Sequence, residues 1–289
     1  VKKEYHDHIL FYRLGDFYEM FFDDAKLASR ELDLTLTGRD CGEVERAPMC
    51  GVPYHSAEGY IAKLVEKGYR VAICEQVEDA AAAVGLVKRE VVRIITPATI
   101  LEGSSGNESA NNFLASLHMD GCKAAFAVCD MKGSEISTTL LEGSSPGDLQ
   151  EKIINELALY QPTELLVSQP FAKGQRVGTY LENRGGCLVV DNLPEAFLSI
   201  SDSTFFLFDE VPSGLDPLQR GAVGAIVFYL EKTQYRSPTN LRRIHAYTHA
   251  AFLEMDASAR RNLELCETMR DRERKGSLLW VLDKTMTTA

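Results

Sequence analysis

Two side chains in the stretch FYEM, Phe17 and Glu19, have types and spacing that could act on stacked bases. An exposed aromatic ring can wedge between bases. Unstacking a base step costs roughly a few kcal/mol, and stacking on a ring returns about 1–3 kcal/mol. Because these energies nearly cancel, insertion is sensitive to the base pair, and a mispaired step costs less to open. A carboxylate near phosphates is repelled, so Glu19 would have to bond a base directly.

The residues around this pair predict a strand, a turn and a helix. Residues 9–12 form a short apolar run typical of a strand, and Gly15-Asp16 breaks it, with Asp16 suited to cap a helix. Apolar side chains then recur at helical spacing, which predicts a helix over residues 18–32. Phe17 is therefore expected at a strand-to-helix turn, from which a ring can project. The same aromatic residues also fit the ordinary alternative, a cluster buried in the core.

Residues 9–98 predict a mixed α/β domain. Further strands are expected at residues 34–37, 71–75 and 91–95, and a second helix at residues 57–67. The loop predicted at residues 38–52 holds Arg39, which could meet a phosphate or be solvated. Residues 102–112 are rich in Gly, Ser and Asn, which is typical of a linker, so the first domain is expected over residues 1–101.

Residues 113–238 predict a second α/β domain. Closely spaced strands are expected at residues 113–118, 123–129 and 135–141, with Gly121 and Gly133 in the turns, so these three should form an antiparallel meander. Helices are then expected at residues 146–160, 171–182 and 215–233, and strands at residues 164–167 and 187–190. A meander followed by alternating helices and strands resembles the ribonuclease H-like fold.

That fold raises an enzymatic alternative, a metal-dependent nuclease that holds two metal ions with clustered carboxylates. The available carboxylates are Asp130, Glu135, Asp191 and Asp209, but Asp130 follows the second strand of the meander rather than the first. Acidic side chains are usually exposed to solvent, and sharing a fold with enzymes does not make a protein an enzyme. Catalysis is therefore not expected. A protein-binding scaffold built on this acidic domain is a third hypothesis.

Residues 239–289 differ in character and are expected to begin a mostly helical core domain that is cut short. A strand is predicted at residues 240–249, and helices are expected to begin near Asp256 and Ser277. His245 and His249 are four residues apart, but no acidic ligand is close in sequence. His6 and His8, in a charged stretch at the start, are likewise expected to be solvated rather than to bind metal.

Composition limits the function classes. The net charge is −11, and the first 103 residues alone carry more acidic than basic side chains, so the chain alone should bind DNA weakly. The seven cysteines are scattered without a CxxC pair, which favours reduced thiols over disulfides or zinc. No signal peptide or transmembrane run is visible. No GxxxxGK[ST] motif is present, so no ATP binding by this chain is expected.

Longer motifs carry a family resemblance. GDFYEMFFDDAKLASRELDLTLTGRD (residues 15–40), PMCGVPYHSAEGYIAKLVEKGYRVAICEQVED (residues 48–79), KREVVRIITP (residues 88–97) and MDASARRNLEL (residues 255–265) closely resemble the bacterial MutS family. The resemblance implies an N-terminal fragment: a mismatch-recognition domain, a ribonuclease H-like connector and the start of the core. One departure is the run Asp79-Ala80-Ala81-Ala82-Ala83, where the family usually has a loop with Pro and Lys.

The resemblance also implies roles. In the family the Phe-x-Glu pair binds the mismatch, which transfers to Phe17 and Glu19. It favours a phosphate contact for Arg39 and places Met49, Tyr54 and His55 near the DNA. It implies mismatched duplex DNA as partner, a MutL-type protein bound through the connector, a homodimer, and ATP with Mg in the full-length ATPase. The expected location is the cytoplasm, at the bacterial nucleoid.

Overall fold

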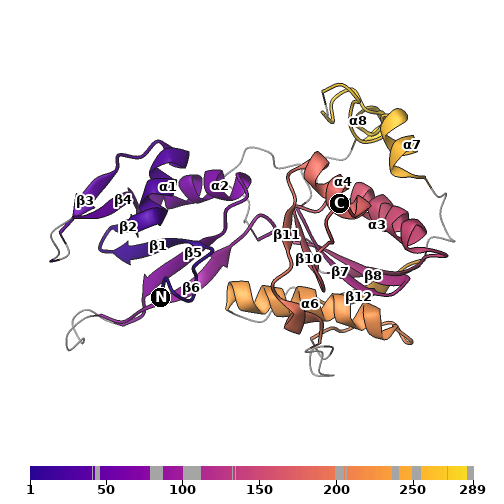
Figure 1. Ribbon diagram of the computed structural model, residues 1–289, viewed down its shortest axis with the longest axis horizontal. Helices are drawn as coiled ribbons and strands as arrows, with labels where there is room; N and C mark the ends of the chain where they lie inside the picture. Colours follow the sequence, from indigo (N-terminus) through magenta and orange to yellow (C-terminus); the bar gives the residue numbers. More distant parts are fainter. Residues whose placement is uncertain are drawn as a thin grey trace. The chain divides into compact units, whose positions relative to one another are not determined.

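The computed structural model describes all residues except 41, 43–45, 79–86, 100–111, 132, 134, 199–204, 206, 236–240, 249–254, 272 and 285–289. The contacts divide the chain into two units, Val1–Glu108 with Leu230–Ser237 and Ser109–Tyr229 with Pro238–Ala289. Each unit contains its own six-stranded sheet with helices packed on it (Figure 1). The run at residues 80–83 and most of the predicted linker lie outside the described residues.

The sheet of the first unit is mixed. Its strands are β1 (Ile9–Leu14), β2 (Phe17–Phe21), β3 (Thr37–Arg39), β4 (Ala47–Pro53), β5 (Val71–Gln76) and β6 (Arg89–Ile95). Their spatial order is β3-β4-β2-β1-β5-β6. β1 and β5 are parallel, and the other neighbouring pairs are antiparallel.

Two helices, α1 (Phe22–Leu32) and α2 (Ala57–Glu66), cover one face of this sheet (Figure 1). The core beneath them includes Phe11 from β1 and Met20 from β2, both fully buried. Because successive side chains of a strand point to opposite faces, Phe17, Glu19 and Phe21 project from the face without these helices. The fold therefore separates a buried helical side from a side that carries the candidate residues.

The predicted helix over residues 18–32 is wrong in its first turn. β2 alternates, with Tyr18 and Met20 buried and Phe17 exposed, and α1 begins only at Phe22. Gly15-Asp16 is accordingly the turn of a β-hairpin that pairs Leu14 with Phe17, not the start of a helix. Asp16 is not the N-cap, because Phe21 precedes the helix and makes no side-chain cap hydrogen bond. Phe17 thus begins the second strand of a hairpin.

The strand predicted at residues 34–37 and the loop predicted at residues 38–52 are also wrong. The short strand β3 begins at Thr37, and β4 occupies much of the predicted loop. β4 lies between β3 and β2, so it is an inner strand despite containing two prolines and a glycine. Arg39 and Met49 therefore lie on strands rather than on a loop. The predicted helix over residues 57–67 is confirmed by α2.

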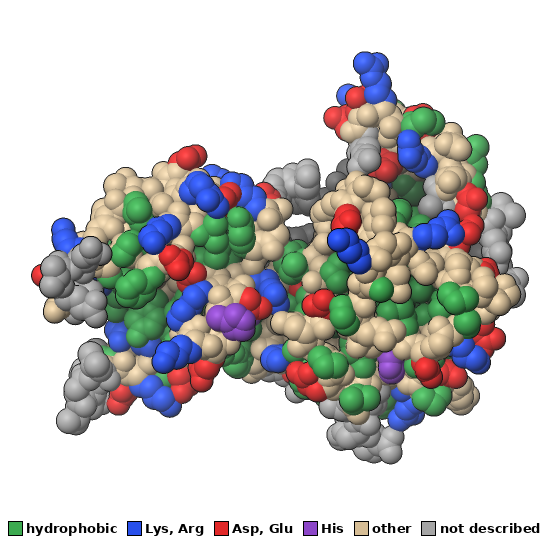
Figure 2. Space-filling view, in the orientation of Figure 1, with side chains coloured by type: hydrophobic (Ala, Val, Ile, Leu, Met, Phe, Trp, Pro, Cys, Tyr) green, Lys and Arg blue, Asp and Glu red, His purple; other side chains and the backbone are tan. Residues whose placement is uncertain are grey.

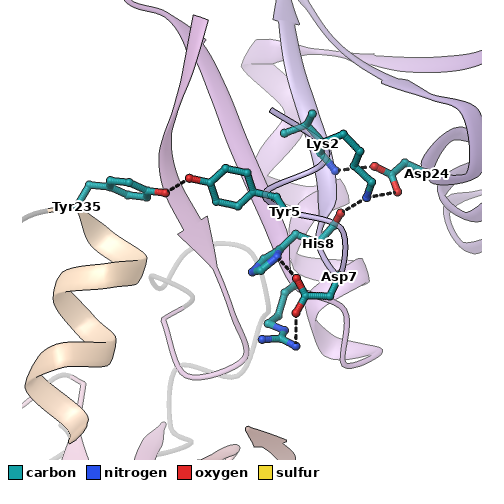
Figure 3. Close-up of polar contacts among 8 residues, drawn as sticks. Lys2, Tyr5, Asp7, His8, Asp24 and Tyr235 are labelled. Atoms are coloured by element: carbon teal, nitrogen blue, oxygen red, sulfur yellow. Dashed lines mark hydrogen bonds and ion pairs between the residues drawn. The ribbon is translucent and has the colours of Figure 1, made fainter. Parts of the chain in front are cut away.

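The N-terminal residues are packed onto the first unit through polar contacts (Figure 3). Lys2 Nζ donates to the backbone oxygen of His8 at 2.6 Å and pairs with Asp24 Oδ1 at 2.8 Å. Asp7 pairs with His8 Nδ1 at 2.7 Å and with the Arg70 guanidinium at 2.9 Å. His8 is therefore held by a neighbouring carboxylate and is not the solvated side chain that we expected. Figure 3 also shows the hydroxyls of Tyr5 and Tyr235 hydrogen-bonded to each other.

The second unit confirms the predicted meander and its parallel extension. Its strands are β7 (Phe113–Asp120), β8 (Lys123–Asp130), β9 (Glu135–Glu142), β10 (Glu164–Val167), β11 (Leu188–Val190) and β12 (Arg243–Ala246). Their spatial order is β11-β10-β7-β8-β9-β12. The pairs β7–β8 and β8–β9 are antiparallel, whereas β10 is parallel to both β7 and β11.

Helices lie on both faces of the second sheet (Figure 1). α3 (Pro146–Tyr160) and α4 (Arg176–Arg184) pack on one face, and α6 (Pro217–Gln234) packs on the other. Ser116 Oγ in β7 donates to the backbone oxygen of Ala222 in α6 at 2.6 Å. α6 approaches this closely because Gly221 has no side chain, and a Cβ there would overlap His118 Nδ1.

The stretch that we expected to start a separate helical domain contributes a strand to this sheet. β12 pairs in parallel with β9, and Tyr247 beyond it donates to Glu156 of α3 at 2.5 Å. Two short helices follow, α7 (Ala257–Asn262) and α8 (Leu278–Leu282). None of the described helices combines the length and apolar character needed to cross a membrane.

Candidate nucleic-acid interface

Phe17 projects outward from the end of the β1–β2 hairpin. Its side chain is 46% exposed, whereas its neighbour Tyr18 is buried. The two-residue turn is made possible by Gly15, whose φ of +59° is a conformation that side chains with a Cβ rarely adopt. The alternative interpretation, an aromatic cluster sealed in the core, is wrong for Phe17, although it holds for Phe11 and Tyr18.

The side chains beside Phe17 follow from the register of β2 and β4. Phe17 lies opposite Pro53, Glu19 opposite Gly51, and Phe21 opposite Met49. A Cβ on Gly51 would come within 3.2 Å of the Tyr18 backbone oxygen and 3.5 Å of Glu19 Cγ. The missing side chain at position 51 therefore leaves the Glu19 carboxylate uncrowded.

Glu19 and Arg39, which the sequence places twenty residues apart, form an ion pair with a hydrogen bond from the guanidinium to Oε2. The Glu19 side chain is 18% exposed and the Arg39 side chain 49% exposed. The Arg39 guanidinium carbon also lies 6.0 Å from the centroid of the Phe21 ring. This face consequently offers an aromatic ring and a carboxylate whose charge is neutralised by a neighbouring cation.

Tyr54 and His55 lie beside the hairpin turn. They belong to a short 3-10 helix, η1 (Tyr54–Ser56), that directly follows β4, and the Tyr54 backbone N–H donates to the Asp16 oxygen at 2.9 Å. The Tyr54 side chain is 45% exposed, and its ring meets the His55 ring edge-on at a centroid distance of 5.8 Å. Two exposed aromatic side chains, Phe17 and Tyr54, thus flank one turn.

Arg13, which the sequence did not single out, also lies beside this turn. Its guanidinium carbon lies 3.7 Å from the Tyr54 ring centroid and 5.5 Å from the Tyr18 ring centroid. An arginine two residues before Gly15 was the available signal, but its contact with Tyr54 depends on how β1, β2 and β4 align. The local sequence pattern does not show how these three strands align.

Charge on the viewed surface is mixed. In Figure 2 the Lys and Arg side chains are interspersed with Asp and Glu side chains in each unit. This distribution fits the net charge of −11 and differs from the broad basic stripe of proteins that grip DNA by charge alone. An interface at Phe17 would have to rely on stacking and a few directed contacts.

The four carboxylates that suggested a nuclease do not form one cluster. Asp191 follows β11, whereas the Asp209 backbone N–H bonds to the Arg242 oxygen beside β12. β11 and β12 are the opposite edges of a six-stranded sheet, so roughly 24 Å of sheet separates them. Asp130 and Glu135 flank one hairpin between β8 and β9. The topology therefore does not favour the nuclease alternative.

The other metal candidates gain no support. Within the described residues, no group of three His, Cys, Asp or Glu side chains is placed to hold a metal ion. His245 lies on β12 with its ring stacked near that of Tyr247, and His249 lies outside the described residues. The cysteines in the part of the chain that the structure describes are free thiols.

Comparison with known protein families gives two matches that together cover most of the chain. Residues 1–104 match the family described as MutS domain I, and residues 112–243 match the family described as MutS domain II. The first match contains the hairpin, Glu19 and Arg39. The second contains strands β7 to β11 of the second sheet and only the first residue of β12, Arg243.

Individual relatives agree with these matches. Proteins named "DNA mismatch repair protein MutS" from Ruminiclostridium cellulolyticum, Acetivibrio thermocellus and Brevibacillus brevis are 44%, 45% and 45% identical to 99% of this chain. The matched regions are 33%, 33% and 31% of those proteins. The chain thus spans about a third of the length of the relatives that it matches.

Proposed function

Because this chain belongs to the MutS family, we propose that its first unit recognises mispaired or unpaired bases in duplex DNA. Phe17 is the wedge that enters the base stack, and Glu19 bonds the displaced base. The observation that supports this most is the exposed Phe17 ring, held at the end of a hairpin on the face without helices.

In this proposal, the protein distinguishes a mispair from a matched pair by the energy needed to open the base step, and not by contacts with a particular base sequence. Stacking a base on Phe17 returns about 1–3 kcal/mol, which roughly equals the cost of opening a base step. A mispair is already weakened, so its opening cost falls below the stacking gain. A matched pair resists insertion, and the protein passes over it.

The Glu19–Arg39 pair accounts for a carboxylate so close to phosphates. While the two side chains are paired, the site carries no net charge and the repulsion between Glu19 and DNA is reduced. When Glu19 turns to a base, Arg39 is released and can meet a phosphate. Met49, opposite Phe21 on β4, and the exposed Tyr54 with its neighbour His55 are proposed to lie near the duplex.

The second unit is proposed to act as a connector that relays binding to repair partners, including a MutL-type protein. In the full-length protein we propose a homodimer that binds ATP and Mg and acts on DNA in the cytoplasm, at the nucleoid. A pull-down with a MutL-type protein tests the connector role, because capture should need residues 113–238 and should not need Phe17.

The DNA-binding proposal is tested by titrating labelled duplexes with one mismatch or with none, at one stated salt concentration. Two proteins are compared: this chain alone, and a full-length chimera in which it replaces the matching region of the Acetivibrio thermocellus relative. We expect the chimera to bind the mismatched duplex at least about tenfold more tightly, which corresponds to about 1.4 kcal/mol. The acidic chain alone should bind both duplexes weakly. Equal affinities of the chimera for the two duplexes would refute the proposal.

A further inference from the structure

The turn that carries Phe17 is held from two directions. Arg13 Nε donates to the Gly15 backbone oxygen at 2.5 Å, and the Tyr54 backbone N–H donates to the Asp16 oxygen at 2.9 Å. Both carbonyls of the two-residue turn are therefore occupied. One donor comes from the strand that precedes the turn, and the other comes from the segment that follows β4.

The two holding residues are joined to each other. The Arg13 guanidinium lies over the Tyr54 ring, with its central carbon 3.7 Å from the ring centroid, a distance typical of a cation–π contact. Turn, arginine and tyrosine thus form a closed set of contacts, in which moving one member disturbs the other two.

Further contacts hold Arg13 in place. Its guanidinium also lies 5.5 Å from the Tyr18 ring, and the Tyr18 hydroxyl donates to Glu75 on β5. Burial and the Glu75 carboxylate raise the pKa of Tyr18 to about 12, so this hydroxyl stays protonated as a donor. Arg89 Nε donates to the Arg13 backbone oxygen at 3.0 Å. Contacts with β2 and β6, and through Tyr18 an indirect link to β5, therefore set the place of the arginine.

Arg13 does not share a face with the ring that it would support. It pairs with Tyr18 in the hairpin, and both side chains point to the side of the sheet opposite Phe17. Any effect of Arg13 on what Phe17 contacts therefore passes through the turn.

We propose that Arg13 is a positioning residue for the Phe17 wedge, and that it acts by locking the Gly15-Asp16 turn against Tyr54. This inference rests on the proposed function of Phe17. A glycine-containing turn without such support samples several conformations, and ordering it during insertion would weaken binding. A locked turn presents the ring before the DNA arrives.

The test measures mismatched and matched affinities of the full-length chimera carrying R13A, R13K or the control R30A. Arg30 is an exposed cation on α1, and its removal changes the net charge by the same amount. We expect R13A to lower the ratio of the two affinities by roughly tenfold, which corresponds to about 1.4 kcal/mol. R13K keeps a cation over the ring but lacks the planar guanidinium, so it should lose about threefold. R30A should retain the ratio.

Salt dependence separates positioning from direct contact. If Arg13 bound a phosphate, its loss would weaken both duplexes equally and reduce the salt slope by about one. A positioning role predicts an unchanged slope and a changed ratio. If R13A and R13K both keep the unmodified protein's ratio of mismatched to matched affinity, the inference is overturned. If R13A does not fold, the R13K measurement alone decides the test.

The same titrations with F17A distinguish this failure from a failure of the proposed function. If F17A abolishes the mismatch preference while the Arg13 variants retain it, the wedge stands and the positioning role falls. If F17A also retains the preference, the proposed function itself fails.

Discussion

Removing the positive charge beside Glu19 is the perturbation that most directly tests how the candidate site tolerates a carboxylate. In Arg39→Gln the ion pair is lost, and Glu19, only 18% exposed, keeps its negative charge on the face that we propose meets DNA. A carboxylate about 7 Å from a phosphate is repelled by ~0.6 kcal/mol at the dielectric constant of water and by ~2.4 kcal/mol at the lower value near a protein surface. A penalty of about 1 kcal/mol, or about fivefold in affinity, lies between these limits.

The assay is a double-mutant cycle on matched-duplex affinity in the full-length chimera, using Arg39→Gln, Glu19→Gln and the combined variant. We expect Arg39→Gln alone to weaken binding about fivefold, because it leaves the Glu19 charge unpaired beside the phosphates. In the Glu19→Gln background the same change should cost only about twofold, since the repulsion is gone. Thermal unfolding is the control, because an ion pair at the surface contributes only about 0–1 kcal/mol to stability.

An equal cost of Arg39→Gln in both backgrounds would refute this reasoning. It would mean that the two side chains act independently on DNA and that the ion pair has no bearing on binding.

The second unit supports further predictions. Gly221→Ala should destabilise the chain by about 1–3 kcal/mol, because its Cβ would overlap His118; Gly59→Ala in α2, with open space around it, should be neutral or stabilising in the same denaturant titration. Tyr247→Phe should cost about 1–3 kcal/mol, since it removes a donor to the buried Glu156 carboxylate, and a midpoint equal to wild type would contradict this. Burial lowers the pKa of His118 below its ordinary 6.5. The free energy of unfolding should therefore have its full value above pH 6.5 and should decrease as the pH falls from 6.5 through the lower pKa of the folded state. His118→Asn should flatten the decline, and an unchanged pH profile would exclude the histidine as its cause.

The second unit was the part of the fold most accessible to sequence reasoning. Its meander has short turns, and α3 carries a Ser-Pro start, with Ser145 Oγ accepting from the Asp148 N–H at 3.2 Å. Those signals are local. The pairing of β12 with β9 joins residues more than a hundred positions apart, and no local pattern indicates it.

In the first unit, one segment fits the hydrophobic periodicity of a helix and that of a strand equally well. Residues 17–21 satisfy helical spacing through Phe17, Met20 and Phe21, and they satisfy strand alternation through Tyr18 and Met20. This segment forms a strand because it pairs with β1 on one side and with β4 on the other. β4 was missed because its composition is poor for a strand, and its place between β3 and β2 comes from tertiary pairing.

The candidate site divides in the same way. The projecting ring and its carboxylate were singled out through the family resemblance, because the local pattern alone also fits a buried aromatic cluster. The contacts of Glu19 with Arg39 and of Arg13 with Tyr54 could not be predicted, because each depends on the alignment of non-adjacent strands.

If one exposed ring inspects base pairs, Phe17→Ala and Phe22→Ala should affect the mismatch preference of the full-length chimera differently. Phe22 is the stricter control, since it begins α1 directly after the other end of β2 and is more exposed, at 62% against 46%. We expect Phe17→Ala to bring mismatched and matched affinities to within about twofold of each other, through the loss of about 1–3 kcal/mol of stacking. Phe22→Ala should keep the preference of the unmodified protein. A Phe17→Ala protein that still prefers the mismatch as strongly would contradict the account.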